Sequence, residues 1–359
     1  MLRVGIVGCG LVAQCIHLPT LRELRDRLIV TAICDVSRSV LDAIGSEWAI
    51  PTRLEDYRDL IAREDVDIVL VANPHVFHAE TAMAAMRKGK HVLIEKPMCM
   101  TVVEADALIK VEEETGVVAQ VGYNRRYAPN LAAAAEVVRA LPGIRLARVH
   151  DVLGRNAIIV PQVTKVITPS DASPIATQKL GDITAAKVIE AIGPASALLQ
   201  NVYMGLVGLS SHDLSAMRAV LGFPQRVLFA TARGDDGRSL AAAFDYGTYT
   251  CLFSSDIDLI PRFDANMEVY SASKVVRVEF NTPFVKSIPA TLTITDIDTH
   301  GMARTSSSFS FRDSFLLEWI ALHETVSTGR RPNTSIADAR QDLLLFRDMI
   351  DHMRTNGSS

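Results

Sequence analysis

Residues 2–13 read LRVGIVGCGLVA, an apolar run followed by two glycines and a small alanine. The run Leu2–Val7 is continuous and rich in Val and Ile, as expected of a strand buried on both faces of a parallel sheet. A GxGxxA pattern begins at Gly8, where this strand would pass into a helix. Gly8 permits the tight turn, Gly10 lets the backbone approach a pyrophosphate, and Ala13 allows close packing of the helix on the strand. The stretch therefore predicts a dinucleotide-binding domain.

The same alternation of strand and helix continues to residue 122. Further apolar runs lie at residues 29–34, 68–72, 91–94 and 117–121, and amphipathic helical patterns separate them. This β-α-β order predicts an α/β fold with a doubly wound parallel sheet. We therefore assign residues 1–122 to an NAD(P)-binding Rossmann domain.

Beyond residue 122 the pattern changes, and we expect residues 123–359 to form a second domain of α+β class. Alternating segments between residues 226 and 295 predict a mainly antiparallel open sheet, and two helices near 313–328 and 335–353 close the chain. Residues 154–205 interrupt this domain, with four prolines and few clear strands. We interpret them as an insertion that carries a short helix near 182–191 and acts as a lid, a binding loop or a packing arm.

Composition excludes several classes of function. The chain has 359 residues, 48% of them hydrophobic and 22% charged, and a net charge of −4. This balance is globular and gives no reason to expect a nucleic-acid or membrane partner. No signal peptide or membrane-spanning run is evident, which predicts a cytoplasmic protein. The five cysteines are expected to be reduced, and neither they nor the histidines show metal-ligand spacing, so we predict no metal.

The end of the second predicted strand bears on the choice of cofactor. Asp35 follows Gly10 by about 25 residues, near the expected position of an acid that accepts hydrogen bonds from the adenosine ribose. Arg38 could pair with the 2′-phosphate of NADP, but Asp35 would repel that phosphate. We therefore favour NAD and keep NADP as the alternative. The other cofactor-binding candidates are Gly8, Cys9, Leu11, Val12, Ala72, Asn73, Pro74, His75, His78, Glu95 and Lys96.

Four more motifs follow the glycine pattern: ANP at 72–74, GKHV at 89–92, EKP at 95–97 and GYNRR at 122–126. In combination they resemble the glucose–fructose oxidoreductase, inositol dehydrogenase and MocA (Gfo/Idh/MocA) family, strongly over residues 1–130 and more loosely beyond. The resemblance implies an NAD(P)-dependent oxidoreductase that acts on a sugar, cyclic polyol or glycoside. It also implies a homodimer or homotetramer.

The resemblance also implies catalytic residues. Lys96 matches the lysine that lies beside the substrate hydroxyl and the nicotinamide, where an ammonium can stabilise an alkoxide or relay a proton. It follows the fifth strand at the carboxyl edge of the sheet, where open α/β folds bind ligands. The residues taken as substrate-binding are Lys96, Tyr123, Asn124, Arg125, Arg126 and His212.

His212 matches the family's catalytic histidine, whose imidazole can take the hydroxyl proton as hydride leaves. The sequence departs from the family around it. Many members carry an Asp four residues earlier, where this chain has Gly208, and a later Asp corresponds to Ser215. Asp213 follows His212 directly and should face elsewhere on a regular helix. The identity of the base is therefore left open between His212, Lys96 and a tyrosine.

Two other functions stay open on the same scaffold. One is redox-neutral or other reductase chemistry with tightly bound NAD. The other is a non-catalytic dinucleotide sensor, which the missing Asp at position 208 would allow and the pair Lys96 and His212 argues against.

Overall fold

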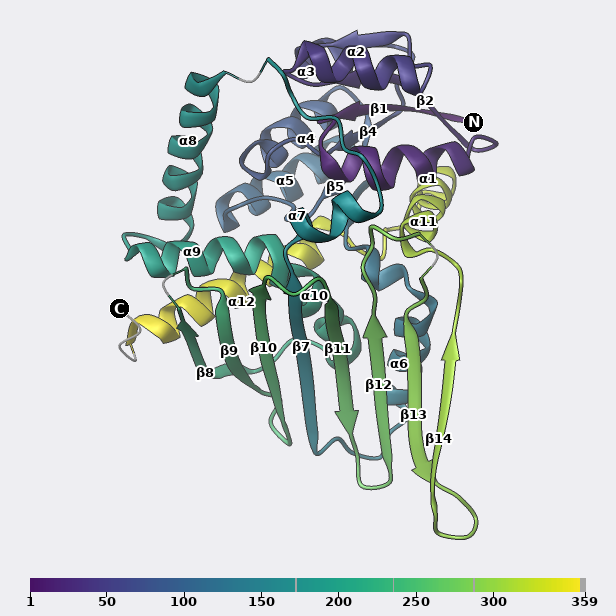
Figure 1. Cartoon of the computed structure of the whole chain (residues 1–359), viewed down its shortest axis with the longest axis vertical. Coiled ribbons are helices and arrows are strands. Elements are labelled where there is room, and N and C mark those ends of the chain that lie inside the picture. Colours follow the sequence, from purple (N-terminus) through teal and green to yellow (C-terminus); the bar gives the residue numbers. More distant parts are fainter. Residues whose placement is uncertain (172, 235, 287, 356–359) are drawn as a thin grey trace. The chain divides into compact units, whose positions relative to one another are not determined.

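A computed structural model describes residues 1–171, 173–234, 236–286 and 288–355 (Figure 1). By packing, the chain divides into two compact units, each assembled from separate stretches of sequence. Unit 1 comprises Met1–Tyr123, Thr164–Ala191 and Phe315–Arg340, and unit 2 comprises Asn124–Val163, Ile192–Ser314 and the chain from Gln341 onward. The division at residue 122 stays a prediction about folding domains.

Unit 1 contains a six-stranded parallel sheet in the order β3-β2-β1-β4-β5-β6. Its strands are β1 (Leu2–Val7), β2 (Leu28–Cys34), β3 (Thr52–Leu54), β4 (Ile68–Val71), β5 (His91–Glu95) and β6 (Ala119–Gly122). This is the strand order of a doubly wound dinucleotide fold. Together with the sheet of unit 2, it confirms the predicted fold class. The short strand β3 was not predicted, because three half-buried residues carry no apolar run.

Helices connect the strands of this sheet. They are α1 (Leu18–Glu23), α2 (Arg38–Glu47), α3 (Tyr57–Ile61), α4 (His78–Arg87) and α5 (Val102–Thr115), with the short 3₁₀ helix η2 (His75–Phe77) before α4. The predicted first helix at 11–26 is interrupted, since residues Ala13–His17 form a π-helical segment, η1, before α1. Pro19 lies in the first turn of α1 and has no N–H for a bond to the preceding turn, which favours a change of helical register there.

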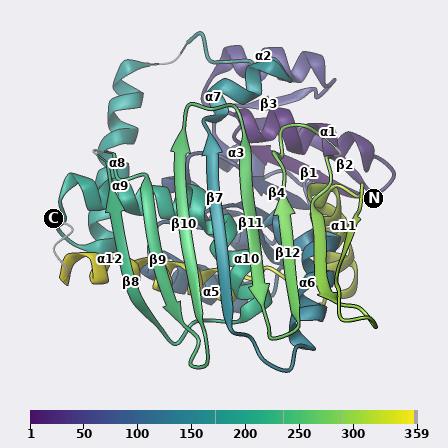
Figure 2. The same cartoon turned by 60° about the horizontal axis from the view of Figure 1, so that its bottom comes forward.

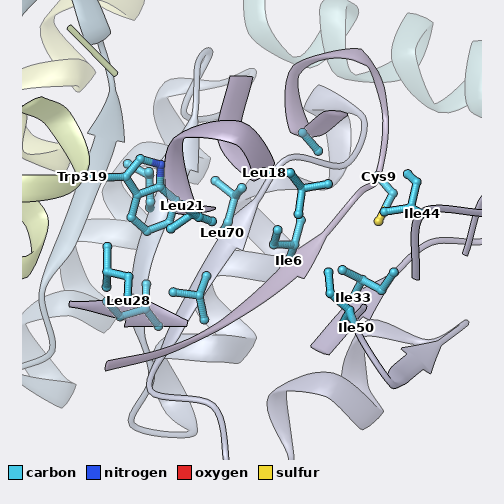
Figure 3. Packing of buried hydrophobic residues seen from close by; sticks show 14 of the residues in the cluster. Ile6, Cys9, Leu18, Leu21, Leu28, Ile33, Ile44, Ile50, Leu70 and Trp319 are labelled. Carbon is cyan, nitrogen blue, oxygen red and sulfur yellow. The ribbon is translucent and has the colours of Figure 1, made fainter. Parts of the chain in front are cut away.

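The core of unit 1 draws on a distant part of the chain. Trp319 of α11 (Ser314–Thr328) is fully buried in one cluster with Leu18, Leu21 and Leu28 (Figure 3). A buried indole removes a large apolar area from water but needs a hydrogen-bond acceptor for its N–H. A helix near the C-terminus thus completes the core of the N-terminal sheet.

Unit 2 contains an eight-stranded sheet in the order β14-β13-β12-β11-β7-β10-β9-β8, whose strands lie side by side in Figure 1. Its strands are β7 (Leu146–Gly154), β8 (Arg226–Arg233), β9 (Ser239–Asp245), β10 (Thr250–Asp258), β11 (Phe263–Tyr270), β12 (Lys274–Phe280), β13 (Thr291–Ile297) and β14 (Ala303–Phe309). All neighbours pair antiparallel except β7 and β10, which run parallel. The strand β14 was missed, because its serines and exposed side chains lack a strand pattern and pairing with β13 alone defines it.

Helices α6 (Pro129–Arg139) and α10 (Ser211–Leu221) pack against this sheet, and Figure 2 shows them with the strands. The remaining helical segments of unit 2 are η3 (Asn124–Tyr127), α7 (Asn156–Ile159), η4 (Val160–Gln162), α9 (Ala197–Gly205) and η5 (Leu206–Ser210). The last helix of the chain is α12 (Ile336–Thr355).

The predicted insertion is more helical than expected. In place of a short helix near 182–191, helix α8 spans Pro174–Ile192. Ser173 accepts the amide of Ala176 at the start of this helix, and Pro174 occupies the first helical position, where a missing N–H costs nothing. Gly181 in the middle of the helix has low helix propensity and obscured the pattern.

Of the described helices, no single one has the length and hydrophobicity required to span a bilayer. One bent pair, Pro174–Ile192 with Ala197–Leu221, meets these criteria by length and composition only.

Unit 2 holds a buried ion pair between helices α10 and α12. The Nε and Nη2 atoms of Arg218 donate to the two carboxylate oxygens of Asp342 at 2.7 and 2.9 Å. Both side chains are almost completely excluded from solvent. Two parallel bonds satisfy both charges and fix the angle at which the last helix meets α10.

Removing one partner of this pair should destabilise the protein strongly. In Asp342→Ala the guanidinium of Arg218 loses its counter-charge while it stays buried, and we expect a loss of about 3–5 kcal/mol in unfolding free energy. Urea denaturation of both proteins measures this. As a control, Arg304→Ala breaks an exposed pair with Asp296 and should leave the transition nearly unchanged. Equal effects of the two variants would contradict the structural role of the buried pair.

Candidate dinucleotide and active site

The predicted residues of unit 1 lie at one edge of its sheet. Residues 8–12 follow β1, Asp35 follows β2, residues 72–75 follow β4, and Lys96 follows β5. The carboxyl ends of parallel strands share one edge, and the strand order reverses between β1 and β4. This reversal is the place where open α/β folds bind ligands.

The two glycines of the motif have different surroundings. A Cβ added to Gly8 would lie 2.4 Å from the backbone of Ala72, and the φ of Gly8 is +96°. Gly8 is therefore required for the close approach of the first turn to the end of β4. Gly10 is exposed, and an added Cβ there would meet no described atom within 4 Å. That open side leaves room for a pyrophosphate against the backbone.

Asp35 is held by backbone amides on both sides. Its carboxylate accepts a hydrogen bond from Cys9 N at 2.8 Å and another from Ser37 N at 2.9 Å. The side chain thus joins the glycine turn to the start of α2. It stays the predicted ribose ligand, since each carboxylate oxygen can accept a further bond.

Arg38, the residue that could have bound a 2′-phosphate, is engaged elsewhere. Its Nε lies 3.2 Å from Asp42, and its Nη1 lies 3.8 Å from Glu55. Both contacts are exposed.

The residues after β4 are linked to the loop after β5. One ring nitrogen of buried His78 lies 2.7 Å from the carbonyl oxygen of Pro97, and the other lies 2.7 Å from that of Asn73. Complete burial lowers the pKa of His78. Both ring nitrogens of His78 thus contact backbone carbonyl oxygens, one on each of the two loops. The peptide bond between Lys96 and Pro97 is cis.

His75 packs its ring edge against that of His78, with centroids 5.5 Å apart. Burial, followed by the charges of His78 and Lys96, lowers the pKa of His75 to about 3. His75 thus presents a neutral ring at this edge at neutral pH.

Beneath Lys96 lies a buried chain of three side chains that the sequence pattern did not reveal. The indole N–H of Trp319 lies 3.0 Å from Nδ1 of His17. Nε2 of His17 lies 2.8 Å from Oε1 of Glu95, and Oε2 of Glu95 accepts the backbone N–H of Lys96 at 3.0 Å. The chain therefore runs from the core of unit 1 to the backbone of the predicted catalytic lysine.

The geometry determines the tautomer of His17. An indole nitrogen can only donate, so Nδ1 of His17 accepts and carries no proton. The single ring proton then lies on Nε2 and is donated to the carboxylate of Glu95. His17 thus orients Glu95.

Glu95 is buried and ionised. Burial disfavours its charge, but the hydrogen bond from His17 and the charge of Lys96 lower the pKa of the carboxyl below its ordinary value. An ionised carboxylate under the backbone of Lys96 fixes the start of the loop that carries the ammonium group. The cofactor-binding role of Glu95 stays a prediction.

In unit 2, Arg125 of η3 is buried between acidic groups. Its guanidinium bonds to Asp213 of α10, lies 3.8 Å from Asp151 of β7, and stacks over the ring of Phe280 at 4.7 Å. This cluster ties the Asn124–Tyr127 turn to the helix that carries His212. These contacts do not test the predicted substrate-binding roles of Asn124, Arg125 and Arg126, which stay predictions.

Other predicted residues have simpler positions. Tyr123 is buried in unit 1, and Asn124 donates to Ser314 Oγ at 3.1 Å in unit 2. His212 lies half-buried in the first turn of α10, directly after the π-helical segment η5. The other π-helical segment, η1, ends at His17. Such segments often occur at functional sites because they shift the register of the following side chains.

No group of three or more His, Cys, Asp or Glu residues is arranged to hold a metal ion in the described part of the chain. The five cysteines all carry free thiols.

The comparison with known families agrees with this geometry. Residues 2–123 match the model of GFO_IDH_MocA, described as an oxidoreductase family with an NAD-binding Rossmann fold. The N-terminal domain is that of the Gfo/Idh/MocA oxidoreductases. The predicted family and the predicted NAD-binding domain are thereby confirmed. The match ends at residue 123, close to residue 130, beyond which the sequence motifs resemble the family more loosely.

Inositol 2-dehydrogenase from Salmonella typhimurium is 34% identical over 128 residues, which cover 35% of this chain and 38% of that protein. The match therefore spans well under half of the length of either protein. Myo-inositol 2-dehydrogenase from Thermotoga maritima is 23% identical over 357 residues, covering 96% of this chain and 94% of that protein.

Among solved structures, KijD10, a 3-ketoreductase from Actinomadura kijaniata in complex with NADP and TDP-benzene, has a TM-score of 0.73. The alignment covers 99% of this chain and 97% of KijD10 at 21% identity. At this identity the likeness concerns the fold alone, and it extends beyond the Gfo/Idh/MocA domain.

The buried carboxylate of Glu95 should leave a signature in the pH dependence of stability. Its pKa in the folded protein lies below the ordinary 4.5, so its ionised form stabilises the fold above pH 4.5 and loses this effect as the pH falls through the folded value. We expect wild type to exceed Glu95→Gln in unfolding free energy by more at about pH 7 than at about pH 3.5. Urea unfolding at both pH values measures the difference. A difference that is the same at both values would mean that the charge of Glu95 contributes nothing to stability.

Proposed function

We propose that this chain is an NAD(P)-dependent oxidoreductase that transfers a hydride between the nicotinamide and a secondary alcohol or ketone of a sugar, cyclic polyol or glycoside. The observation that carries the proposal is the position of Lys96 directly after β5, at the same sheet edge as the strand reversal between β1 and β4, with its backbone N–H bonded to a buried carboxylate. The family of the N-terminal domain and the names of the inositol dehydrogenases support it.

Unit 1 would hold the cofactor with its pyrophosphate over residues 8–13 and its adenosine ribose near Asp35. The nicotinamide, when bound, supplies the hydride acceptor or donor. Lys96 supplies a positive charge that stabilises an alkoxide on the substrate. The proposed substrate-binding residues are Lys96, Tyr123, Asn124, Arg125, Arg126 and His212.

The substrate is best found by direct assay. A panel of sugars, cyclic polyols and glycosides, each tested with NAD and with NADP, should show reduced nicotinamide at 340 nm for at least one class. A panel without turnover in either direction, with ketones as reverse substrates, would contradict the proposed reaction.

Lys96→Ala should lower kcat by about 100-fold or more, since it removes the charge offered to the reacting oxygen. NADH affinity, followed by fluorescence titration, should stay within about threefold, since the ammonium is placed away from the pyrophosphate. Lys88→Ala, an exposed lysine at the end of α4, is the control and should retain full activity. A fully active Lys96 variant would exclude the catalytic role.

His212 is the proposed proton acceptor in the oxidation direction. It occupies the first turn of α10, and the neighbouring Asp213 is committed to Arg125. The carboxylate that many relatives place four residues earlier is absent, because this position is Gly208. An added Cβ at Gly208 would meet no described atom within 4 Å, so the structure has room for an acidic side chain there.

His212→Asn should lower kcat by about 100-fold and flatten the pH dependence of kcat/KM between about pH 5 and 8. Gly208→Asp tests the missing carboxylate in the same assay, and an orienting role predicts equal or higher activity for it. A His212 variant with the wild-type rate and pH profile would show that another group takes the proton.

The proposal extends to the state of the protein in the cell. Association into a homodimer or homotetramer and a cytoplasmic location stay predictions. The exposed apolar side chains Leu228, Phe229 and Leu252 on β8 and β10 would be covered in such an oligomer.

A further inference from the structure

Residues 164–171, here called the strap, belong to unit 1 and lie against its dinucleotide motif. The backbone N–H of Ile167 donates to Gln14 Oε1 at 2.8 Å, and Gln14 Nε2 donates to the carbonyl of Ile167 at 2.9 Å. Gln14 Nε2 also donates to the carbonyl of Cys9 at 2.8 Å. The strap is thereby fixed to the glycine turn, and Figure 1 shows it, in teal, leading to α2.

The strap ends with an acidic side chain at the start of α2. Oδ1 of Asp171 accepts from Ser37 Oγ at 2.5 Å and from Ser39 Oγ at 2.9 Å. Oδ2 accepts from the backbone N–H of Ser39 at 3.1 Å. One carboxylate thus takes two hydroxyls and one amide from residues that lie 132 and 134 positions earlier in the chain.

These donors adjoin the predicted ribose site. Ser37 donates its backbone N–H to Asp35, the residue expected to bind the adenosine ribose. In this fold the groups just beyond that residue accommodate the 2′-phosphate of NADP. Two hydroxyls and an amide in the first turn of a helix form a set of donors suited to such a phosphate.

We propose that Asp171 determines cofactor specificity by occupying the 2′-phosphate position, so that the chain accepts NAD and rejects NADP. The proposal rests on the dinucleotide-binding function proposed above. It assigns the inserted segment a role in unit 1 in addition to any role toward the substrate.

The charges around Asp171 also disfavour the binding of NADP. The hydrogen bonds from Ser37 and Ser39 lower the pKa of Asp171 to about 2, so the side chain is an anion at neutral pH. A 2′-phosphate would meet the carboxylates of both Asp35 and Asp171. The cation that could offset them, Arg38, is paired with Asp42 and lies near Glu55. NAD carries only a hydroxyl at this position and meets no such repulsion.

The experiment is a fluorescence titration of the full chain with NADH and with NADPH. It compares wild type with Asp171→Ala, which removes the acceptor, and Asp171→Asn, which removes the charge and keeps the size. Asp182→Ala is the matched control, because Asp182 is an exposed acid on α8 that accepts a hydrogen bond from Gln178 of the same helix. Asp35→Ala is a positive control and should weaken NADH more than NADPH.

Wild type should prefer NADH. Both Asp171 variants should bind NADPH about tenfold or more tightly than wild type does, with NADH within about threefold, and the gain should shrink at high salt because Asp171 is exposed. The Asp182 variant should match wild type.

An unchanged ratio of NADPH to NADH affinity in both Asp171 variants would overturn the proposal. Equal weakening of both cofactors would also overturn it, since the strap would then support the fold alone. A wild-type chain that binds neither cofactor would instead refute the dinucleotide-binding function. A wild type that binds NADH, with Asp171 variants that do not gain NADPH, would refute only the specificity role.

Discussion

The hydrogen bond between His17 and the buried carboxylate of Glu95 is the interaction on which the candidate site of unit 1 depends. An unpaired carboxylate in a protein interior is costly and would take up a proton. Here Trp319 fixes the tautomer of His17, and the imidazole presents its one proton to Glu95. The second carboxylate oxygen is then free to hold the backbone of Lys96.

This arrangement links the stability of the core to the position of a reactive group. Trp319 is buried by the hydrophobic effect among the side chains of the first helix and strands, and its indole N–H needs an acceptor there. That acceptor, Nδ1 of His17, belongs to the chain of side chains that reaches Lys96. A change in the core that moved the indole would therefore also move the loop that carries Lys96.

Acidic side chains near the predicted adenosine-ribose site are likewise held by hydrogen bonds. Asp35 accepts hydrogen bonds from the amides of Cys9 and Ser37, and Asp171 accepts from hydroxyls and an amide at the start of α2. The guanidinium of Arg38 pairs with Asp42 at the surface of α2. The electrostatic environment of the ribose site is thus set by two acids, one from the motif region and one from the inserted segment.

In unit 2 the sequence predicted the sheet and the helix that carries His212, but not which groups the polar side chains contact. The GYNRR segment was interpreted as substrate-binding, and the structure shows Arg125 buried between Asp151 and Asp213. A guanidinium buried between two acids can serve a structural role. No local sequence pattern distinguishes that role from substrate binding. The strands β3 and β14 were missed for a related reason, since their pairing partners, and not their own residues, define them.

By itself, the sequence determined five of the six strands in the first 122 residues, the glycine turn, the acid after the second strand, and the lysine after the fifth predicted strand. These features depend on hydrophobic periodicity and backbone freedom, which are local properties of the chain. Only the tertiary structure decided that Trp319 reaches His17 across 302 residues and that Asp171 reaches Ser37 across 134. Such contacts form because buried or charged groups need partners of matching chemistry, and the fold alone determines which distant residue supplies them.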